Sequence, residues 1–202
     1  MLMFIKTLKE NLKQLLPELS KKIDELEKPW EALRILGEVK IDENKINGEI
    51  EEGVIIKGKI ILGKGSVIRS PARLEGNIII GEGTIIGPYS FIRGNAVIGN
   101  ECKIGSTEVK HSIILDNSNA CHFNYIGDGV IGQRCNLGAG TKIANLRFDR
   151  EEVKLRIDGE KIPLGTNKFG VVFENEVQTM CNSVLMPGSY VKEGSKINYK
   201  QK

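Results

Sequence analysis

The chain has 202 residues, of which 40% are apolar and 27% charged, and its formal net charge is +3. This composition is that of an ordinary folded chain with one sizeable core, which excludes the disordered and fibrous classes. No long basic run and no stretch near the roughly 18 apolar residues of a membrane helix occurs, so we expect no nucleic-acid partner and no membrane partner. Without a cleavable signal pattern at its start, a cytoplasmic location is expected.

Residues 4–36 predict a helical segment, because they lack glycine and their apolar residues recur every three or four positions. Pro17 and Pro29 interrupt the pattern, and proline suits the first turn of a helix, so two or three short helices are expected. Residues 1–37 are interpreted as a helical cap, because the end of a repeat domain exposes apolar core and strand edges. Packing in a trimer, or a helix for a membrane surface or a partner, are the alternatives.

From Ile50 to Ile104 an aliphatic residue occupies every sixth position, and a small or β-branched residue follows most of them four positions later. Glu108 is the last and poorest match to that second position. A short fixed period marks a solenoid, in which each unit buries its apolar face by stacking on the next. Residues 38–202 are therefore predicted to form a mainly β domain, a hexapeptide-repeat β-helix with three units in each triangular coil.

The repeat is broken at residues 106–126 and 144–170, and it resumes at 131–142 and again from Phe173 to Val191. Insertions in a solenoid become loops on one face, and ligands often bind there, so both breaks are expected to carry function. Within the second break, residues 153–157 alternate in polarity and Asp158-Gly159 is a strong turn signal. A small hairpin is predicted in this insertion.

Both histidines of the chain, His111 and His122, lie in the first break. No metal is predicted, because a zinc site needs three or four ligands and the four cysteines have no paired spacing. Cys102 and Cys135 occupy the small inward position and are expected to be buried free thiols. Since an imidazole exchanges protons near neutral pH, His122 is a candidate base for an incoming amine, and a packed or surface histidine is the ordinary alternative.

Several runs resemble, in order and spacing, the acetyltransferase domain of the bifunctional N-acetylglucosamine-1-phosphate uridyltransferases. They are GPYSFIR at 87–93, EVK at 108–110, HFNYIGD at 122–128, NLGAGT at 136–141 and AN at 144–145. The version with NLRFD at 145–149 and a basic insertion is closer to archaeal sugar-1-phosphate nucleotidylyltransferases with the same C-terminal domain. WEAL at 30–33 looks like the start of short stand-alone members. The similarity covers roughly residues 50–197.

This resemblance implies a left-handed parallel β-helix, a homotrimer with active sites between neighbouring solenoids, and acetyl-CoA as co-substrate. His122 would be the general base that deprotonates the 2-amino group of a glucosamine-1-phosphate-like acceptor, and Asn145 would position the amine or the developing oxyanion. The other implied ligands are Arg93, Lys110 and Lys168 for the sugar phosphate, Tyr125 and Asn136 for the sugar, and Cys181 for the coenzyme. Convergent cations and aimed donors are what such a reaction requires.

Each of these residues also has an ordinary alternative: a solvated repeat position for Arg93, packing over a corner for Tyr125, and a turn for Asn145. Residues 146–167 replace the family's short loop, so the acceptor is expected to differ. The family's nucleotidyltransferase signature is absent, and no nucleotidyl transfer is expected from this chain alone. Two other functions stay open: a non-catalytic trimeric scaffold or regulatory partner of a separate nucleotidyltransferase, and an acyltransferase with another acceptor.

Overall fold

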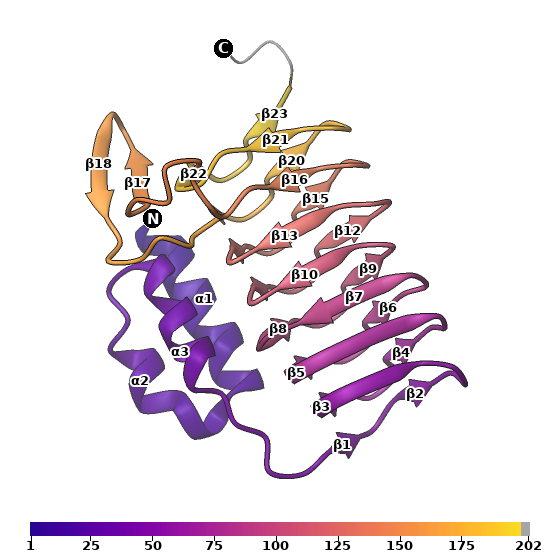
Figure 1. The fold of residues 1–202 in the computed structure, drawn as a ribbon. Helices are drawn as coiled ribbons and strands as arrows, with labels where there is room; N and C mark the ends of the chain where they lie inside the picture. Colours follow the sequence, from indigo (N-terminus) through magenta and orange to yellow (C-terminus); the bar gives the residue numbers. More distant parts are fainter. Residues whose placement is uncertain (199–202) are drawn as a thin grey trace.

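Short parallel strands stack into a solenoid with three faces (Figure 1). The computed structural model describes residues 1–198. One face is an eight-stranded sheet. Its strands are β2 (Glu49–Ile50), β4 (Val67–Ile68), β6 (Ile85–Ile86), β9 (Lys103–Gly105), β12 (Asn119–Cys121), β15 (Asn136–Leu137), β20 (Gln178–Thr179) and β23 (Lys196–Ile197). The predicted mainly β solenoid is confirmed.

A second sheet of 15 strands forms the other two faces. The face that we call the β7/β10/β13 face contains β7 (Ser90–Arg93), β10 (Glu108–Lys110), β13 (Tyr125–Gly127), β16 (Lys142–Ile143) and β21 (Val184–Leu185). The face that we call the helix-covered face contains β8 (Ala96–Ile98), β11 (Ile113–Ile114), β14 (Val130–Ile131), β19 (Val171–Phe173) and β22 (Ser189–Val191). The long strands β3 (Ile55–Leu62) and β5 (Ala72–Ile80) run across both faces, and β1 (Lys45–Ile46) pairs with β3.

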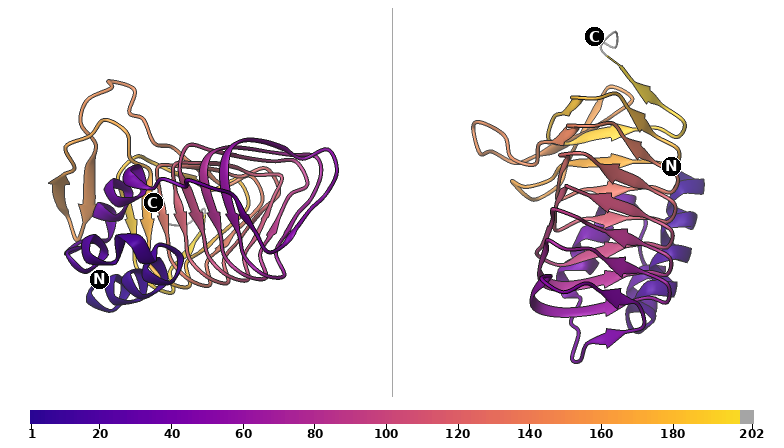
Figure 2. Two further views of the ribbon diagram at one scale, coloured as in Figure 1. Left: turned by 90° about the horizontal axis from the view of Figure 1, so that it is seen from below. Right: turned by 90° about the vertical axis from the view of Figure 1, so that its right-hand side faces the viewer.

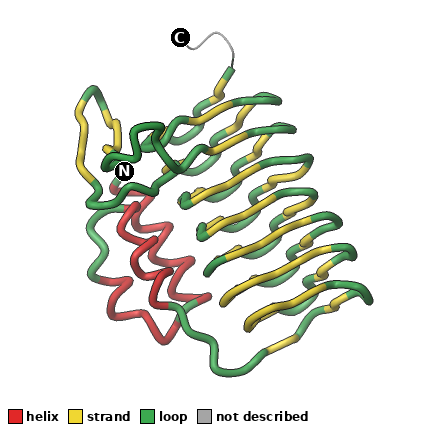
Figure 3. Tube along the Cα trace, in the orientation of Figure 1, coloured by secondary structure: helices red, strands yellow, loops and turns green. Residues whose placement is uncertain are grey.

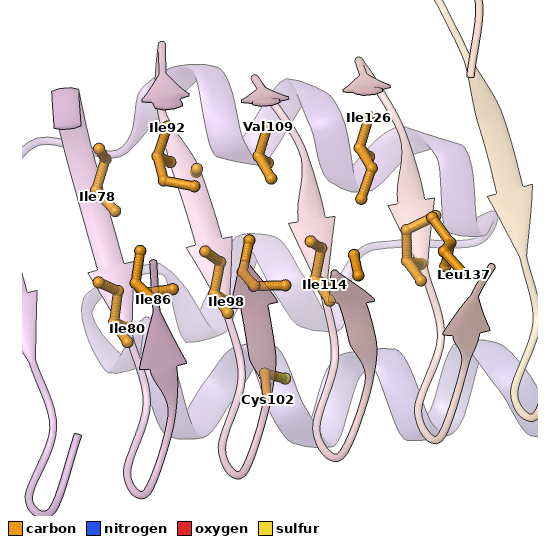
Figure 4. Packing of buried hydrophobic residues seen from close by; sticks show 14 of the residues in the cluster. Ile78, Ile80, Ile86, Ile92, Ile98, Cys102, Val109, Ile114, Ile126 and Leu137 are labelled. Carbon is orange, nitrogen blue, oxygen red and sulfur yellow. The ribbon is translucent and has the colours of Figure 1, made fainter. Parts of the chain in front are cut away.

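The aliphatic residues predicted from the six-residue period fill the interior of the solenoid. Figure 4 shows Ile80, Ile86, Ile92 and Ile98 pointing inward from successive strands. All ten positions belong to this core, with only the first two partly buried, and each fully buried aliphatic side chain contributes about 1.5–3 kcal/mol. Cys102 lies in the same core as a free thiol, as predicted, and burial raises its pKa to about 12.

The first break in the repeat is a shortened coil and not an inserted loop. Ile86 pairs with Ile104 eighteen residues later, whereas Ile98 pairs with Ile114 after only sixteen. The lost residues shift the inward small position from Glu108 to Thr107, which is buried and donates a hydrogen bond to the Ala120 carbonyl. Glu108 consequently projects outward. The expectation of a loop at residues 106–126 was therefore wrong.

The N-terminal helices are α1 (Leu2–Leu15), α2 (Ser20–Asp24) and α3 (Ala32–Glu38), with 3-10 turns η1 (Pro17–Leu19) and η2 (Pro29–Glu31). Both prolines stand at the first position of a turn, as predicted. We expected a cap over a solenoid end, but the helices lie along the helix-covered face (Figure 2, left). Within residues 1–198 no helix combines the length and hydropathy needed to span a membrane.

The helices lie there because the strands of this face are apolar on both sides. Ile79, Val97 and Val130 point away from the solenoid core and form a second core with Leu8 and Leu12 of α1. A sheet with two apolar faces needs a cover on each of them. Figure 3 shows the result, with the helices in red standing beside the stacked coils.

Two asparagines join this helical layer to the solenoid. Asn95 Nδ2 donates to the carbonyls of Leu36 (2.9 Å) and Val39 (3.1 Å) at the end of α3, and Asn77 Nδ2 donates to Val39 at 3.2 Å. The last carbonyls of a helix lack the regular intrahelical partner, and these side chains supply donors to them.

Asn95→Ala should lower the free energy of unfolding by about 1–3 kcal/mol, because two hydrogen bonds to the carbonyls of Leu36 and Val39 are lost. Urea denaturation measures the loss. The matched control is Asn47→Ala, an exposed asparagine whose change should stay within about 0.5 kcal/mol. Equal stability of the two variants would show that Asn95 does not fasten the helices.

The second break is the inserted segment that was predicted. Ile131 pairs with Phe173, and the chain between them first runs through β15 and β16 of the stack. Residues 144–170 then leave the stack and return to it. They include an antiparallel hairpin of β17 (Lys154–Ile157) and β18 (Glu160–Pro163). Its turn at Asp158-Gly159 has positive φ at both residues, as the sequence predicted. Leu155 and Phe169 pack into the second core, which ties the insertion to the helical layer.

Candidate functional site

Parallel pairing brings three of the predicted ligands together on the β7/β10/β13 face. Arg93 of β7 lies beside Lys110 of β10, and Glu108 of β10 lies beside Tyr125 of β13. Because alternate residues of a strand point to the same side, these side chains share the outer surface of the sheet. The inward neighbours Ile92, Val109 and Ile126 hold the strands on the solenoid core.

Each of the two cations has a carboxylate partner. Arg93 Nε donates to Glu108 Oε1 at 2.7 Å. Lys110 Nζ lies 2.8 and 2.6 Å from the two carboxylate oxygens of Asp128, which is buried. Asn145 Nδ2 donates to the same carboxylate. Asp128 therefore fixes both Lys110 and Asn145, a role that the sequence analysis did not assign although the residue closes the HFNYIGD run.

Gly127 makes room for the aromatic ligand. Gly127 pairs with Lys110, which in turn pairs with Arg93. A Cβ on Gly127 would lie 2.7 Å from the Tyr125 hydroxyl oxygen and 2.9 Å from Asn145 Nδ2. Tyr125 thus lies over a position without a side chain. Burial raises the pKa of its hydroxyl, with Glu108 acting in the same direction, so the group stays protonated and can donate a hydrogen bond.

His122 lies at the other end of β13, in the turn that joins β12 to it. Its backbone has φ +70°, its N–H donates to the Gly105 carbonyl, and its carbonyl accepts from Gly140. The imidazole is exposed and makes no hydrogen bond or ion pair within residues 1–198. Lys142 lies at the same corner, and its Nζ donates hydrogen bonds to the carbonyls of Phe123 and Gly140. The sequence analysis did not single it out.

The remaining predicted residues lie elsewhere in the single chain. Lys168 borders a pocket with His111 and Asp128, close to the Lys110 ion pair. Asn136 is exposed on the eight-stranded face between Asn119 and Gln178. Cys181 is exposed at the corner that carries His122, two coils further on. One chain therefore assembles the proposed phosphate ligands and leaves the base, one sugar ligand and the coenzyme contact apart from them.

Stacked six-residue units with this outer face define a hexapeptide-repeat parallel β-solenoid. The family model described as the GMPPB C-terminal domain matches residues 74–167. A "Bifunctional sugar-1-phosphate nucleotidylyltransferase/acetyltransferase" of Sulfurisphaera tokodaii is 40% identical over 80% of this chain and 41% of its own length. A "Bifunctional protein GlmU" of Methanococcus aeolicus is 41% identical over 85% of this chain and 42% of its own. The chain is thus a homologue of these two bifunctional proteins, which confirms the predicted resemblance.

The chain spans about two fifths of the length of these relatives. Among solved structures, one titled as a hexapeptide transferase family protein from Anaplasma phagocytophilum covers 76% of this chain, and 71% of that chain is covered. Its identity is 16% and its TM-score 0.30, an overlap too loose to carry a conclusion about this chain.

Proposed function

We propose that this protein transfers an acetyl group from acetyl-CoA to the amino group of an amino-sugar phosphate. The observation that supports this most is the convergence of Arg93, Lys110 and Tyr125 on one outer face. An anionic sugar needs cations and a neutral donor held in fixed positions: Glu108 holds Arg93, and Asp128 holds Lys110 together with Asn145. The proposed location of the reaction is the cytoplasm.

In the proposed reaction His122 accepts a proton from the acceptor amine as the nitrogen attacks the thioester carbonyl. The new C–N bond forms, the C–S bond breaks, and the coenzyme A thiolate takes up a proton from the imidazolium. Asn145, held by Asp128, orients the amine or the developing oxyanion. A well-placed donor to an oxyanion contributes about 3–4 kcal/mol in other acyl-transfer enzymes.

The proposal requires a homotrimer. His122 and Asp128 stand at opposite ends of β13, separated by up to about 20 Å of extended chain. A neighbouring copy that adds its own corner to the β7/β10/β13 face would bring a base to the acceptor. In support, apolar side chains are exposed near both corners of this face, among them Phe123 (75%), Val184 (65%) and Phe148 (102%). Sedimentation equilibrium should give three times the chain mass, and a monomer would contradict the proposal.

The direct test follows the free thiol released from acetyl-CoA with glucosamine-1-phosphate as acceptor. Acetyl-CoA alone should raise the melting temperature, because a ligand that binds only the folded state stabilises it. The scaffold alternative, which binds no acetyl-CoA, also requires an exposed apolar stripe on the helices. That stripe is instead buried against the solenoid, with Leu8, Leu12 and Leu36 fully covered. The helices therefore give little support to the scaffold alternative.

Gly127→Ala should lower kcat/KM for acetyl transfer about 10- to 100-fold without unfolding the protein. The added methyl displaces the Tyr125 ring and the Asn145 amide, and a misplacement of about 1 Å costs rates of this order. The matched control is Gly129→Ala, where the nearest atoms stand 3.5 Å away in ordinary contact. Steady-state kinetics of both variants measure the effect. Unchanged kinetics for Gly127→Ala would remove Tyr125 and Asn145 from the acceptor site.

A further inference from the structure

A pocket of about 400 Å³ lies where the helical layer, the insertion and the solenoid meet. We call it the interlayer pocket. Its polar lining comes from Arg34 of α3, His111 and Asp128 of the solenoid, and Thr166 and Lys168 of the insertion. Trp30 and other apolar side chains complete its wall. In Figure 1 the segment after β18 passes beside the upper part of the helical layer. The volume is that of a site for a small organic ligand.

The charges in this pocket favour an anion. The one carboxylate, Asp128, is already neutralised by Lys110 at 2.6 Å. Arg34 and Lys168 are both exposed, and within residues 1–198 neither has a carboxylate within ion-pair distance. Burial lowers the pKa of His111, and the Leu33 backbone accepts a hydrogen bond from it. The imidazole is thus neutral near pH 7, and the two basic side chains dominate the potential of the pocket.

The interlayer pocket continues the proposed acceptor site. Asp128 belongs to both, because it anchors Lys110 on the β7/β10/β13 face and lines the pocket. On that face the cations Arg93 and Lys110 are partly neutralised by their own carboxylates. Arg34 and Lys168, which line the interlayer pocket beside this face, have no such carboxylate partner within residues 1–198. An acceptor that reaches from the face to these groups must carry a second anionic group.

We infer that the interlayer pocket binds the distal phosphate of a nucleoside-diphosphate amino sugar, so that the acceptor is of this class and not a sugar monophosphate. The inference rests on the proposed acetyl transfer for the chemistry, but the binding itself does not depend on catalysis. Arg34 and Lys168 contact the phosphate, Arg34 with the planar fork that suits phosphate oxygens. Both side chains come from segments outside the repeat, so the helical layer and the insertion determine the acceptor class.

Calorimetry without acetyl-CoA tests the inference with two probes, uridine diphosphate glucosamine and glucosamine-1-phosphate. The diphosphate should bind about tenfold or more tightly, since hydrogen bonds to charged groups contribute that much. Arg34→Ala should remove this preference, and Arg34→Lys should retain part of it. The control is Lys21→Ala, another exposed basic residue of the helical layer. Melting temperatures should be equal for all variants, because Arg34 is exposed.

Equal affinity for the two probes, or a preference that survives Arg34→Ala, would overturn the inference. Thiol release separates this failure from that of the proposed function. If glucosamine-1-phosphate gives the same rate of thiol release with the parent protein and with Arg34→Ala, acetyl transfer is supported and the assignment of the pocket is overturned. Binding of the diphosphate through Arg34 without thiol release under any acceptor would support the pocket and overturn acetyl transfer.

Discussion

His122→Asn should reduce kcat for acetyl transfer about 10²- to 10⁴-fold, the contribution of a positioned general base. Asparagine is the informative replacement because it tolerates the positive φ of this position and cannot exchange a proton near neutral pH. The imidazole makes no bond that holds the turn within the described residues, so the melting temperature should not change. Thiol release at saturating acceptor measures the effect.

The control is Glu101→Asn, an exposed turn residue with φ +53° at another corner of the solenoid. It makes the same kind of backbone substitution without touching the proposed site. Equal rates for His122→Asn and the parent would remove this residue from the mechanism. A fall in melting temperature confined to the His122 variant would indicate a structural role for the turn.

Asp128→Asn should lower the free energy of unfolding by about 3 kcal/mol or more. The change preserves shape and suits the positive φ of the residue, but it leaves Lys110 without its counter-charge in a largely buried place. Removing one partner of a buried ion pair costs about 3–5 kcal/mol for this reason. Urea denaturation measures the loss, and Asp42→Ala, an exposed carboxylate, is the control.

Adding Lys110→Met to Asp128→Asn should restore part of the lost stability, because it removes the stranded charge and keeps an apolar stem of similar length. Additive losses in the double variant would show that the two side chains do not interact across β10 and β13. Acetyl transfer should stay low in both variants, since the single variant loses the carboxylate that fixes Lys110 and Asn145, and the double variant also lacks Lys110 itself.

The interior of the solenoid was predictable because its period is local. Ile86 and Ile98 follow from counting sixes, and the hairpin turn follows from Asp158-Gly159. The outward-facing surface of the solenoid was less predictable. A shortened coil moved Thr107 into the core and turned Glu108 toward Arg93, a shift that a rigid six-residue register cannot express. The six-residue period also identifies only the side chains that point into the solenoid. The apolar side chains on the outer side of the helix-covered face were therefore missed, and so was the position of the helices.

The site shows the same division. Arg93, Lys110 and Tyr125, which the resemblance named as ligands, lie together on one face, since parallel pairing between coils keeps equivalent residues in columns. Asp128 and Gly127 were overlooked because their importance lies in what neighbouring strands bring beside them. Asn136 lies apart from His122 on the eight-stranded face, and Cys181 lies at the His122 corner two coils further on.

The pairing of Val130 with Val172 and of Ile143 with Leu185 means that the stack continues as though residues 144–170 were not there. This arrangement separates the residues that stabilise the solenoid from those that recognise a ligand. The insertion can be lengthened, shortened or exchanged while every coil of the solenoid keeps its pairing. A lineage carrying this architecture can therefore change what it recognises through one appendage, without rebuilding the framework that supports it.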